Sequence, residues 1–450
     1  MAAESFVARL DAVPLNRFHR KLLITSGLGW MFDAMDVILI SFLILPIRTE
    51  FELAATDTRV AFIAAAGFLG MFLGAAVSGR LADRYGRRAV FQATLILFSL
   101  GSLLSAFAPT FETLLAARVV AGLGLGGELP VVATLVSEFS PRKSRGRMIV
   151  LLESFWAYGT VLAGLIAIFV LPNPQWGWRG AFLVGALPAL YVAYLRRALP
   201  ESPRFLASVG RAAEADAVVR RVEREGGGAL ITVSRVQAPP PAVRKATLGD
   251  LFSGVLARRT AMLWVLWFGI VFTYYGIFLY LPSLLAARGL SEVRSNEFFF
   301  LSTIAQIPGY FSAAFLVERW GRKPTLVLYL LGTAASAFLF GNAGTGSDAF
   351  LWASLLSFFN LGAWGVVYTY SPELYPTSIR ASGAGAAAAV GRVGGIAAPF
   401  VTPVLVGPLG QSGVFALFTA LIVATALAVF LLAEETRGRS LEEIADTRAP

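Results

Sequence analysis

The sequence contains no cysteine and only one histidine, His19, among its 450 residues. The absence of cysteine excludes disulfides, thiolate metal sites and thiol catalysis. A single histidine does not make a histidine-based zinc site, so no metal and no other cofactor is expected. His19 stands just before the first long apolar run, and we expect it at the membrane interface.

Charged residues are also scarce, at 15% of the chain against 56% hydrophobic residues. A soluble globular protein has about a quarter charged residues. The apolar residues gather in runs of roughly 20, the length of helix that crosses a bilayer. The sequence therefore predicts an all-α membrane protein with twelve transmembrane helices. The expected spans are 22–47, 59–79, 89–108, 112–138, 147–171, 177–198, 260–286, 296–317, 324–342, 348–371, 380–406 and 412–433.

An enzyme is not expected, because the chain offers no cysteine, histidine cluster, nucleotide-binding loop or metal-ligand spacing. The net charge of +10 has another explanation. Lys and Arg gather at 80–88, 141–147 and 318–323, while loops 109–112 and 172–176 hold almost none. The positive-inside rule then places both termini in the cytoplasm and the chain in the inner (plasma) membrane. Contact with anionic lipid is a by-product of this charge distribution, and no nucleic acid is expected as a partner.

Two separate motifs recur at one distance. DRYGRR at 83–88 is echoed by ERWGRK at 318–323, so that Arg84 and Arg319 are 235 positions apart (319 − 84). Glu138 and Arg145 recur as Glu373 and Arg380 at the same distance. This register predicts two pseudo-symmetric six-helix bundles, at 1–198 and 259–450, joined by a cytoplasmic central loop with a short helix at 199–258. Parallel repeats of this kind are typical of transporters with a site between the halves.

These motifs resemble those of the major facilitator superfamily over nearly the whole chain. GRLADRYGRR (79–88) matches the signature between the second and third spans. PESPRFL (200–206) and EETRGRSLEEI (434–444) resemble the sugar-porter-type endings of the two halves, with Glu434 in place of the family's proline. Span seven reads WFGIVFTYYGIFLY and lacks the family's glutamine-rich sugar signature, which counts against a sugar as substrate.

Other stretches resemble narrower branches of that superfamily. GWMFDAMD (29–36) and LLESFWAYG (151–159) look like bacterial niacin permeases. AVGRVGGIAAPF (389–400) is similar to organic anion transporters, whose matching arginine is linked to anion handling. Trp156 and Trp364 match tryptophans of the synaptic vesicle glycoprotein branch, where the one at Trp364 contacts ligand. The resemblance implies a small-molecule transporter in this neighbourhood.

Ionisable side chains at membrane depth are functional candidates by default. Those in this chain are Asp33, Asp36, Arg118, Glu128, Glu153 and Arg392. Arg392 lies 12 residues after Arg380, or about 18 Å along a helix, which places it near the midplane. A buried guanidinium needs an anion. The substrate supplies it in one reading, and an interhelical salt bridge to Asp33, Glu128 or Glu153 in the other.

Trp156 and Trp364 are expected to line the same cavity. The repeat distance relates Trp156 to Gly391, next to Arg392, and Trp364 to Leu129, next to Glu128. Aromatic walls beside an arginine suit a small aromatic carboxylate, because its ring stacks while the arginine takes the carboxylate. The alternative for each aromatic residue is packing or contact with lipid. Further candidates for substrate contact are Tyr274, Tyr275, Gln306, Asn360 and Tyr368.

Asp33 and Asp36 stand three positions apart, about one helical turn. Desolvation and mutual repulsion favour a proton on at least one of them. We therefore predict proton symport with Asp33 or Asp36 as carrier and with Glu153 and Glu128 as further candidates. In the alternative, one aspartate bonds helix donors or pairs with an arginine and never titrates.

The family resemblance also implies an inner network of salt bridges. Paired charges of this kind close the inner side in one state and separate in the other, whereas simple positive-inside anchoring is the alternative. Arg118, followed by several glycines, resembles the family's fourth-span motif and is placed with this network. The network residues are Asp83, Arg84, Arg87, Arg118, Glu138, Arg145, Arg322, Glu373 and Arg380.

The leading interpretation is a monomeric secondary transporter that imports a small aromatic carboxylate, niacin (nicotinate), by proton symport with alternating access. The alternatives within transporters are another aromatic acid, an organic cation or a sugar. A non-transporting membrane receptor is the alternative from another class.

Overall fold

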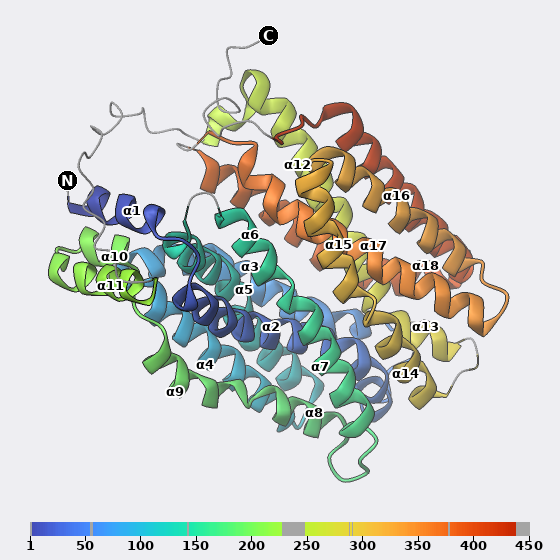
Figure 1. Cartoon of the computed structure of the whole chain (residues 1–450). Coiled ribbons are helices and arrows are strands. Elements are labelled where there is room, and N and C mark those ends of the chain that lie inside the picture. Colours follow the sequence, from blue (N-terminus) through green and yellow to red (C-terminus); the bar gives the residue numbers. More distant parts are fainter. Residues whose placement is uncertain are drawn as a thin grey trace. The chain divides into compact units, whose positions relative to one another are not determined.

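The computed structural model describes residues 2–54, 57–141, 144–226, 248–287, 289, 291–376 and 379–437, and over these ranges the chain forms helices and no strand (Figure 1). The α-helices are α1 (Ala2–Ala12), α2 (Arg17–Glu50), α3 (Arg59–Tyr85), α4 (Arg87–Ala106), α5 (Phe111–Phe139), α6 (Arg145–Glu153), α7 (Phe155–Phe169), α8 (Gly177–Gly185), α9 (Pro188–Ala198), α10 (Pro203–Ser208), α11 (Ala212–Glu225), α12 (Gly254–Phe278), α13 (Leu281–Ala287), α14 (Glu292–Thr303), α15 (Gln306–Arg319), α16 (Arg322–Gly341), α17 (Gly346–Glu373) and α18 (Arg380–Leu432). One 3-10 helix, η1 (Leu248–Phe252), precedes α12.

Eleven helical stretches of the described chain are long and apolar enough to cross a membrane. The last of them, Gly383–Leu432, has 50 residues. A single straight helix of that length would measure about 75 Å, more than twice the hydrocarbon thickness of a bilayer. The backbone leaves the helical conformation at Gly410, where φ is 65°, so this stretch contains two spans. All twelve predicted spans are therefore confirmed as helices.

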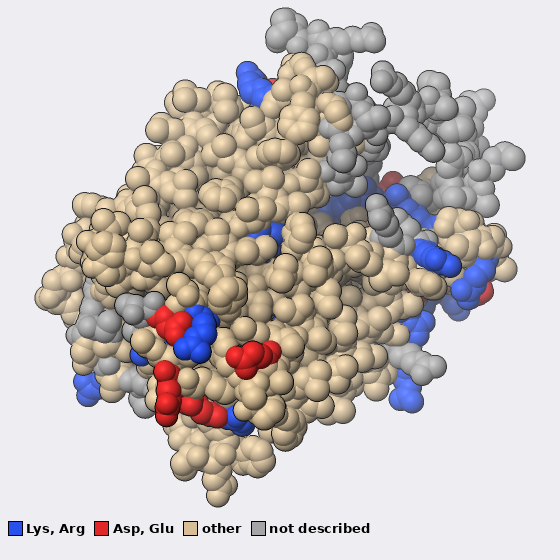
Figure 2. All heavy atoms as spheres, turned by 180° about the vertical axis from the view of Figure 1, so that it is seen from behind, with Lys and Arg blue, Asp and Glu red and all other residues tan. Residues whose placement is uncertain are grey.

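Large apolar side chains are exposed on these helices, as expected of surfaces that face lipid. Phe169, Leu190 and Leu431 are 75%, 74% and 69% exposed. Most of the face shown in Figure 2 carries no charged side chain, and the charged residues gather there in small groups. The spans thus present a hydrocarbon-like exterior, which is what a multi-pass protein of the inner membrane requires.

The contacts between residues divide the chain into two compact units, whose boundaries fall inside α2, α3, α7 and α8. Unit 1 comprises residues 1–34, 69–156 and 182–242, and unit 2 comprises residues 35–68, 157–181 and 243–450. This division differs from the expected bundles at 1–198 and 259–450, because parts of the first half pack with the second. In unit 2, Phe42 packs on Phe299 at 5.0 Å and Phe68 packs on Tyr275 at 4.4 Å between ring centroids.

In unit 1, α4 packs against α5 and α9, and α1 lies against α10 and α11 (Figure 1). Arg9 of α1 binds both carboxylate oxygens of Glu223 at 2.8 Å and Asp216 at 2.6 Å. The short central helix predicted from sequence is α11, whereas the linker at 227–247 lies outside the described residues. His19 is 1% exposed and contacts the Phe139 carbonyl at 3.1 Å, so it packs inside the protein, and its expected place at the depth of the membrane interface stays a prediction.

In unit 2, α12 packs along α18, and α17 packs along α15 and α16. The α12–α18 contact is close because glycines of α18 face it: a Cβ on Gly391 would lie 2.9 Å from Val271 and 3.1 Å from Trp267. Small residues let membrane helices approach closely and gain van der Waals contact. This approach fixes the neighbouring Arg392 relative to the aromatic residues of α12.

Candidate functional site

Three carboxyl groups on the membrane helices of unit 1 are almost wholly buried: Asp33 on α2, Glu128 on α5 and Glu153 at the end of α6 are each at most 1% exposed. The Glu128 carboxyl group lies against α2 one turn before Asp33, since a Cβ on Gly29 would lie 2.6 Å from Glu128 Oε1. Asp33 is near enough to affect it electrostatically. Two carboxyl groups close together and away from water share a proton more readily than they both ionise. Asp36, also fully buried on α2, lies one turn beyond Asp33.

Two tryptophans accompany these acids. Trp30 and Trp156 are 2% and 8% exposed, and their rings pack with centroids 5.1 Å apart at 48°. Trp30 stands one turn before Asp33, and Trp156 stands three residues after Glu153. We call these five residues (Trp30, Asp33, Glu128, Glu153 and Trp156) the acidic set.

The helix of span five is locally distorted within this set. α6 ends at Glu153 and α7 begins at Phe155, but Ser154 between them keeps helical dihedral angles, and its N–H donates to the Val150 carbonyl at 3.0 Å. Its hydroxyl bonds the Leu151 carbonyl at 2.7 Å. Span eight has a similar distortion between Thr303 and Gln306, where Pro308 has no N–H to donate to the Ile304 carbonyl.

Unit 2 holds a cluster of aromatic rings. Trp364 stacks on Tyr368 at 5.6 Å and 28°, and Trp267 meets both edge-on, at 5.8 Å and 5.2 Å. Tyr274 packs against Trp364 at 5.9 Å and against Tyr275 at 5.0 Å. The Trp267 indole donates to the Ser371 hydroxyl at 2.9 Å, which fixes its plane.

Arg392 belongs to this cluster. It is half-buried on α18, and its guanidinium is an electrostatic neighbour of the Tyr275 hydroxyl on α12. Tyr275 in turn contacts Tyr274, which packs on Trp364. A cation thus lies at one end of a continuous run of rings. We call these six residues (Trp267, Tyr274, Tyr275, Trp364, Tyr368 and Arg392) the aromatic set.

Buried amide groups lie on the helices beside the aromatic set. Gln306 and Asn360 are 0% and 1% exposed. Within the described chain, neither amide atom of Gln306, nor Asn360 Oδ1, nor the Trp364 indole nitrogen has a hydrogen-bond partner. Leaving such a group unsatisfied costs about 1–3 kcal/mol. Buried polar atoms are normally satisfied by protein, water or ligand, so these groups suit the recognition of a polar molecule.

The expected inner network is present in part. Arg322 pairs with Glu373 at 2.8 Å and Arg87 pairs with Glu138 at 3.5 Å. Both pairs join neighbouring helices of the same half rather than the two halves. Arg145 binds the Ser137 carbonyl at 3.0 Å and pairs with Asp11 at 3.5 Å. Asp11 was not among the expected residues.

Other members of the expected network lie elsewhere. Arg118 is 2% exposed and its guanidinium lies 5.2 Å from the Phe182 ring centroid. Arg84 is exposed and lies over Tyr85 at 5.3 Å. The side chains of Asp83 and Arg380 lie outside the described part of the structure.

Two glutamates, from the PESPRFL and EETRGRSLEEI motifs, cap helices. Glu201 accepts the backbone N–H of Arg87 at 3.0 Å, and Glu435 accepts that of Arg322 at 3.0 Å. Each caps the first turn of its helix, where a carboxylate is favoured by the helix dipole. The preceding Gly86 and Gly321 have φ of 99° and 107°, and a Cβ on either would overlap the capping carboxylate.

The chain resembles known transporters over almost its full length. A family profile described as "Sugar (and other) transporter" matches residues 35–447. The niacin transporter NiaP of Acinetobacter baylyi is 49% identical over 439 residues, which cover 97% of this chain and 99% of that protein. The synaptic vesicle 2-related protein of Rattus norvegicus is 31% identical, over 96% of this chain and 81% of that protein.

Solved structures show the same fold. The partially occluded inward-open structure of the xylose transporter XylE from E. coli has a TM-score of 0.76 to this chain. It is 20% identical and the match covers 93% of this chain and all of that one. The family profile and NiaP are both named as transporters, which confirms the expectation of a transporter rather than an enzyme.

Proposed function

The chain belongs to the sugar (and other) transporter family of the major facilitator superfamily, and from this premise we propose that it imports niacin, as the nicotinate anion, together with protons. The protein lies in the inner membrane as a monomer surrounded by lipid, with both termini in the cytoplasm. Its two halves expose the substrate to either side in turn.

The observation that carries this proposal is the run of rings from Trp364 to Arg392 in unit 2. Nicotinate is a flat aromatic ring with a carboxylate at one edge. Trp364 and Tyr368 offer a stacked aromatic surface, on which such a ring gains contact area and favourable quadrupole interactions. Arg392 lies at the other end of the run beside Tyr275, and its guanidinium matches a carboxylate bidentately. The 49% identity to a niacin transporter supports the same substrate.

The acidic set supports proton coupling. Asp33 and Glu128 are both almost wholly buried, and the Glu128 carboxyl group lies against α2 at Gly29, one turn from Asp33. A shared proton on such a pair is released when the carboxyl groups separate or when water reaches them. We assign the coupling proton to this pair, with Glu153 and Asp36 as further candidates. The sequence alone pointed to Asp33 with Asp36.

The proposal is tested by uptake of labelled nicotinate into proteoliposomes under an imposed proton gradient. Nicotinate should accumulate, and Arg392→Gln should weaken its binding by about 10- to 100-fold, the value of a hydrogen bond to a charged group. Arg294→Gln removes an exposed arginine at the start of α14 and serves as the matched control. A receptor that does not transport would bind nicotinate without accumulating it.

An organic cation is the second candidate, because the buried carboxyl groups of the acidic set would attract positive charge. The two substrates separate cleanly in the same assay. A cation carrier retains uptake of its cation after Arg392→Gln and does not accumulate nicotinate. An anion carrier loses nicotinate uptake after Arg392→Gln, whereas its binding of the neutral amide, nicotinamide, is unchanged.

A further inference from the structure

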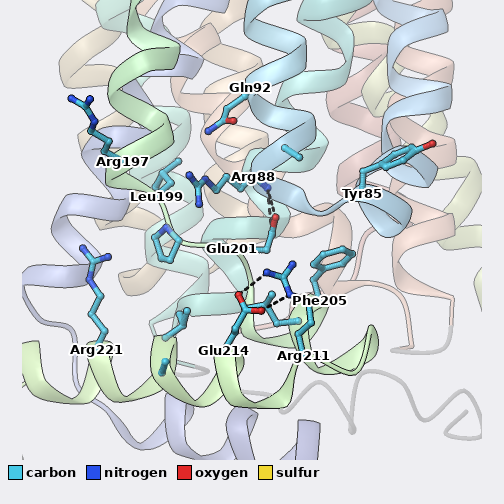
Figure 3. A pocket seen from close by; sticks show the side chains of 15 residues that line it. Tyr85, Arg88, Gln92, Arg197, Leu199, Glu201, Phe205, Arg211, Glu214 and Arg221 are labelled. Atoms are coloured by element: carbon cyan, nitrogen blue, oxygen red, sulfur yellow. Dashed lines mark hydrogen bonds and ion pairs between the residues drawn. The ribbon is translucent and has the colours of Figure 1, made fainter.

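A pocket lies in unit 1 and is lined by no residue of the acidic set. It is an open pocket with a volume of about 590 Å³, lined by the end of α3, the start of α4, the end of α9, α10 and α11 (Figure 3). Its lining includes four arginines and two glutamates, an excess of two positive charges (4 − 2). The four arginines are Arg88, Arg197, Arg211 and Arg221. The role of this pocket is not explained by niacin transport.

Both glutamates of the pocket are already engaged. Glu201 accepts the backbone N–H groups of Arg87 and Arg88 at 3.0 Å and 3.2 Å, and Glu214 forms two hydrogen bonds of 2.6 Å with Arg211. Both glutamates therefore bind groups of the protein itself, and the excess positive charge of the pocket is available to a ligand.

Two arginines at the rim are weakly engaged. Arg221 pairs with Glu225 at a long 3.5 Å, and Arg197 is exposed and has no salt bridge to any residue that the structure describes. In Figure 3 these two arginines lie on one side of the pocket, Arg197 above and Arg221 below. Gln92 extends toward the same space from α4, and its buried Nε2 has no hydrogen-bond partner within the described chain. The donors together suit a ligand with several anionic oxygens.

The helix that carries Arg197 also carries a lipid-facing stripe. Leu187, Leu190 and Tyr194 are 55%, 74% and 56% exposed, and their spacing of three and four residues, continued by Arg197, places all four on one helical face. From Leu187 to Arg197 the rise is about 15 Å, close to the hydrocarbon depth of one leaflet. A molecule with apolar chains on this stripe would hold its polar head at Arg197.

We propose that this pocket binds the phosphate headgroup of an anionic phospholipid from the leaflet on the side of the chain termini. Arg197 and Arg221 contact the phosphate, Gln92 donates to it, and Leu199 and Phe205 line the inner wall. The acyl chains lie along α9. Glycerol phosphate shares the headgroup chemistry but lacks the chains, so it distinguishes a lipid site from a site for a soluble phosphate ester.

The test is native mass spectrometry of the purified full-length protein titrated with phosphatidylglycerol or phosphatidylcholine. Phosphatidylglycerol should bind more tightly, and Arg197→Gln/Arg221→Gln should weaken its binding roughly fivefold for each arginine removed. The control Arg224→Gln/Arg294→Gln removes the same charge from exposed positions outside the pocket and should retain wild-type binding. Thermal unfolding without added lipid should be the same for both double variants.

Three results would overturn the proposal. Equal loss in both double variants would show a general charge effect. Equal binding of the two lipids would show that the pocket does not distinguish an anionic headgroup from a zwitterionic one with the same phosphate. Displacement of phosphatidylglycerol by glycerol phosphate at the same concentration would show a site for a soluble phosphate ester rather than for lipid.

Discussion

Arg322 holds Glu373 with two parallel hydrogen bonds, Nε to Oε2 at 3.0 Å and Nη2 to Oε1 at 2.8 Å. The equivalent pair of the first half, Arg87 and Glu138, 235 positions earlier (322 − 87 and 373 − 138), has a single contact of 3.5 Å. The Glu373 carboxylate also accepts the Thr436 hydroxyl at 2.6 Å. The two halves therefore keep the same pair at different strengths.

This asymmetry predicts unequal effects of the matched substitutions. Glu373→Gln should lower the free energy of unfolding by about 2 kcal/mol, because it removes charge-assisted, part-buried hydrogen bonds. Glu138→Gln should cost less than about 1 kcal/mol, as expected of a long, single contact. Thermal unfolding in detergent measures both. The prediction is wrong if the two variants are equally destabilised.

The aromatic set predicts that Trp364 contributes directly to affinity. Trp364→Ala should raise the KM for nicotinate about tenfold, because it removes the stacked surface shared with Tyr368. Trp364→Phe should retain part of the affinity. Trp320 is 52% exposed just after α15, so Trp320→Ala controls for the loss of a tryptophan away from the aromatic set. An unchanged KM in Trp364→Ala would assign Trp364 to packing alone.

The carboxyl pair predicts a separation of transport from coupling. Asp33→Asn and Glu128→Gln should both retain exchange of labelled for unlabelled nicotinate but lose accumulation driven by a pH gradient. Exchange needs no net proton movement, whereas accumulation does. Glu112→Gln, an exposed acid in the first turn of α5, is the control on the same helix as Glu128. Gradient-driven accumulation that survives in both pair variants would remove Asp33 and Glu128 from the coupling mechanism.

A salt bridge at the end of α18 predicts acid sensitivity. Burial alone would raise the pKa of Glu434, but hydrogen bonds and charge from Arg259 and Arg258 lower it below its ordinary value of 4.5. Arg259 is 3% exposed and binds Glu434 at 2.7 Å. A carboxyl group whose pKa is lowered on folding stabilises the protein above its unfolded pKa, and this contribution is lost as pH falls through the folded pKa.

The measurement is thermal unfolding of the wild type and Glu434→Gln between pH 6 and pH 3. The wild type should lose stability below about pH 4.5, at the ordinary pKa of glutamate, and Glu434→Gln should be less stable at pH 6 but lose less on acidification. Parallel curves for the two proteins would show that Glu434 does not contribute to the acid response.

The spans were predictable from sequence because a bilayer demands long apolar helices, and length and composition report that demand directly. The distortion at Ser154 was not predictable, since no proline follows within the next turn, whereas the one before Gln306 follows from Pro308, which cannot donate to the Ile304 carbonyl. Trp30 and Trp267 were missed because a tryptophan in an apolar helix reads the same whether it packs, faces lipid or lines a site. Only the neighbours, Trp156 for one and Trp364 for the other, distinguish them.

The contact partners of the site residues were predicted less well than their burial. The buried positions of Asp33, Glu128 and Glu153 follow from their place in apolar runs, and the structure buries all three. That Glu128 lies near Asp33 does not follow from the sequence, because the two residues are distant in the chain. The Glu128 carboxyl group occupies the space left by the missing side chain of Gly29, which no sequence pattern reveals. For the same reason Arg118, placed by motif with the inner network, is found against Phe182.

The capping glutamates show that the internal repeat extends beyond the membrane helices. Glu201 and Glu435 follow their respective helix starts by the same distance to within one residue (201 − 87 and 435 − 322), and each is admitted by a glycine of positive φ. The segment after each half therefore belongs to the repeat and fastens back onto the first turn of a helix in its own half, rather than serving only as a connector or a tail.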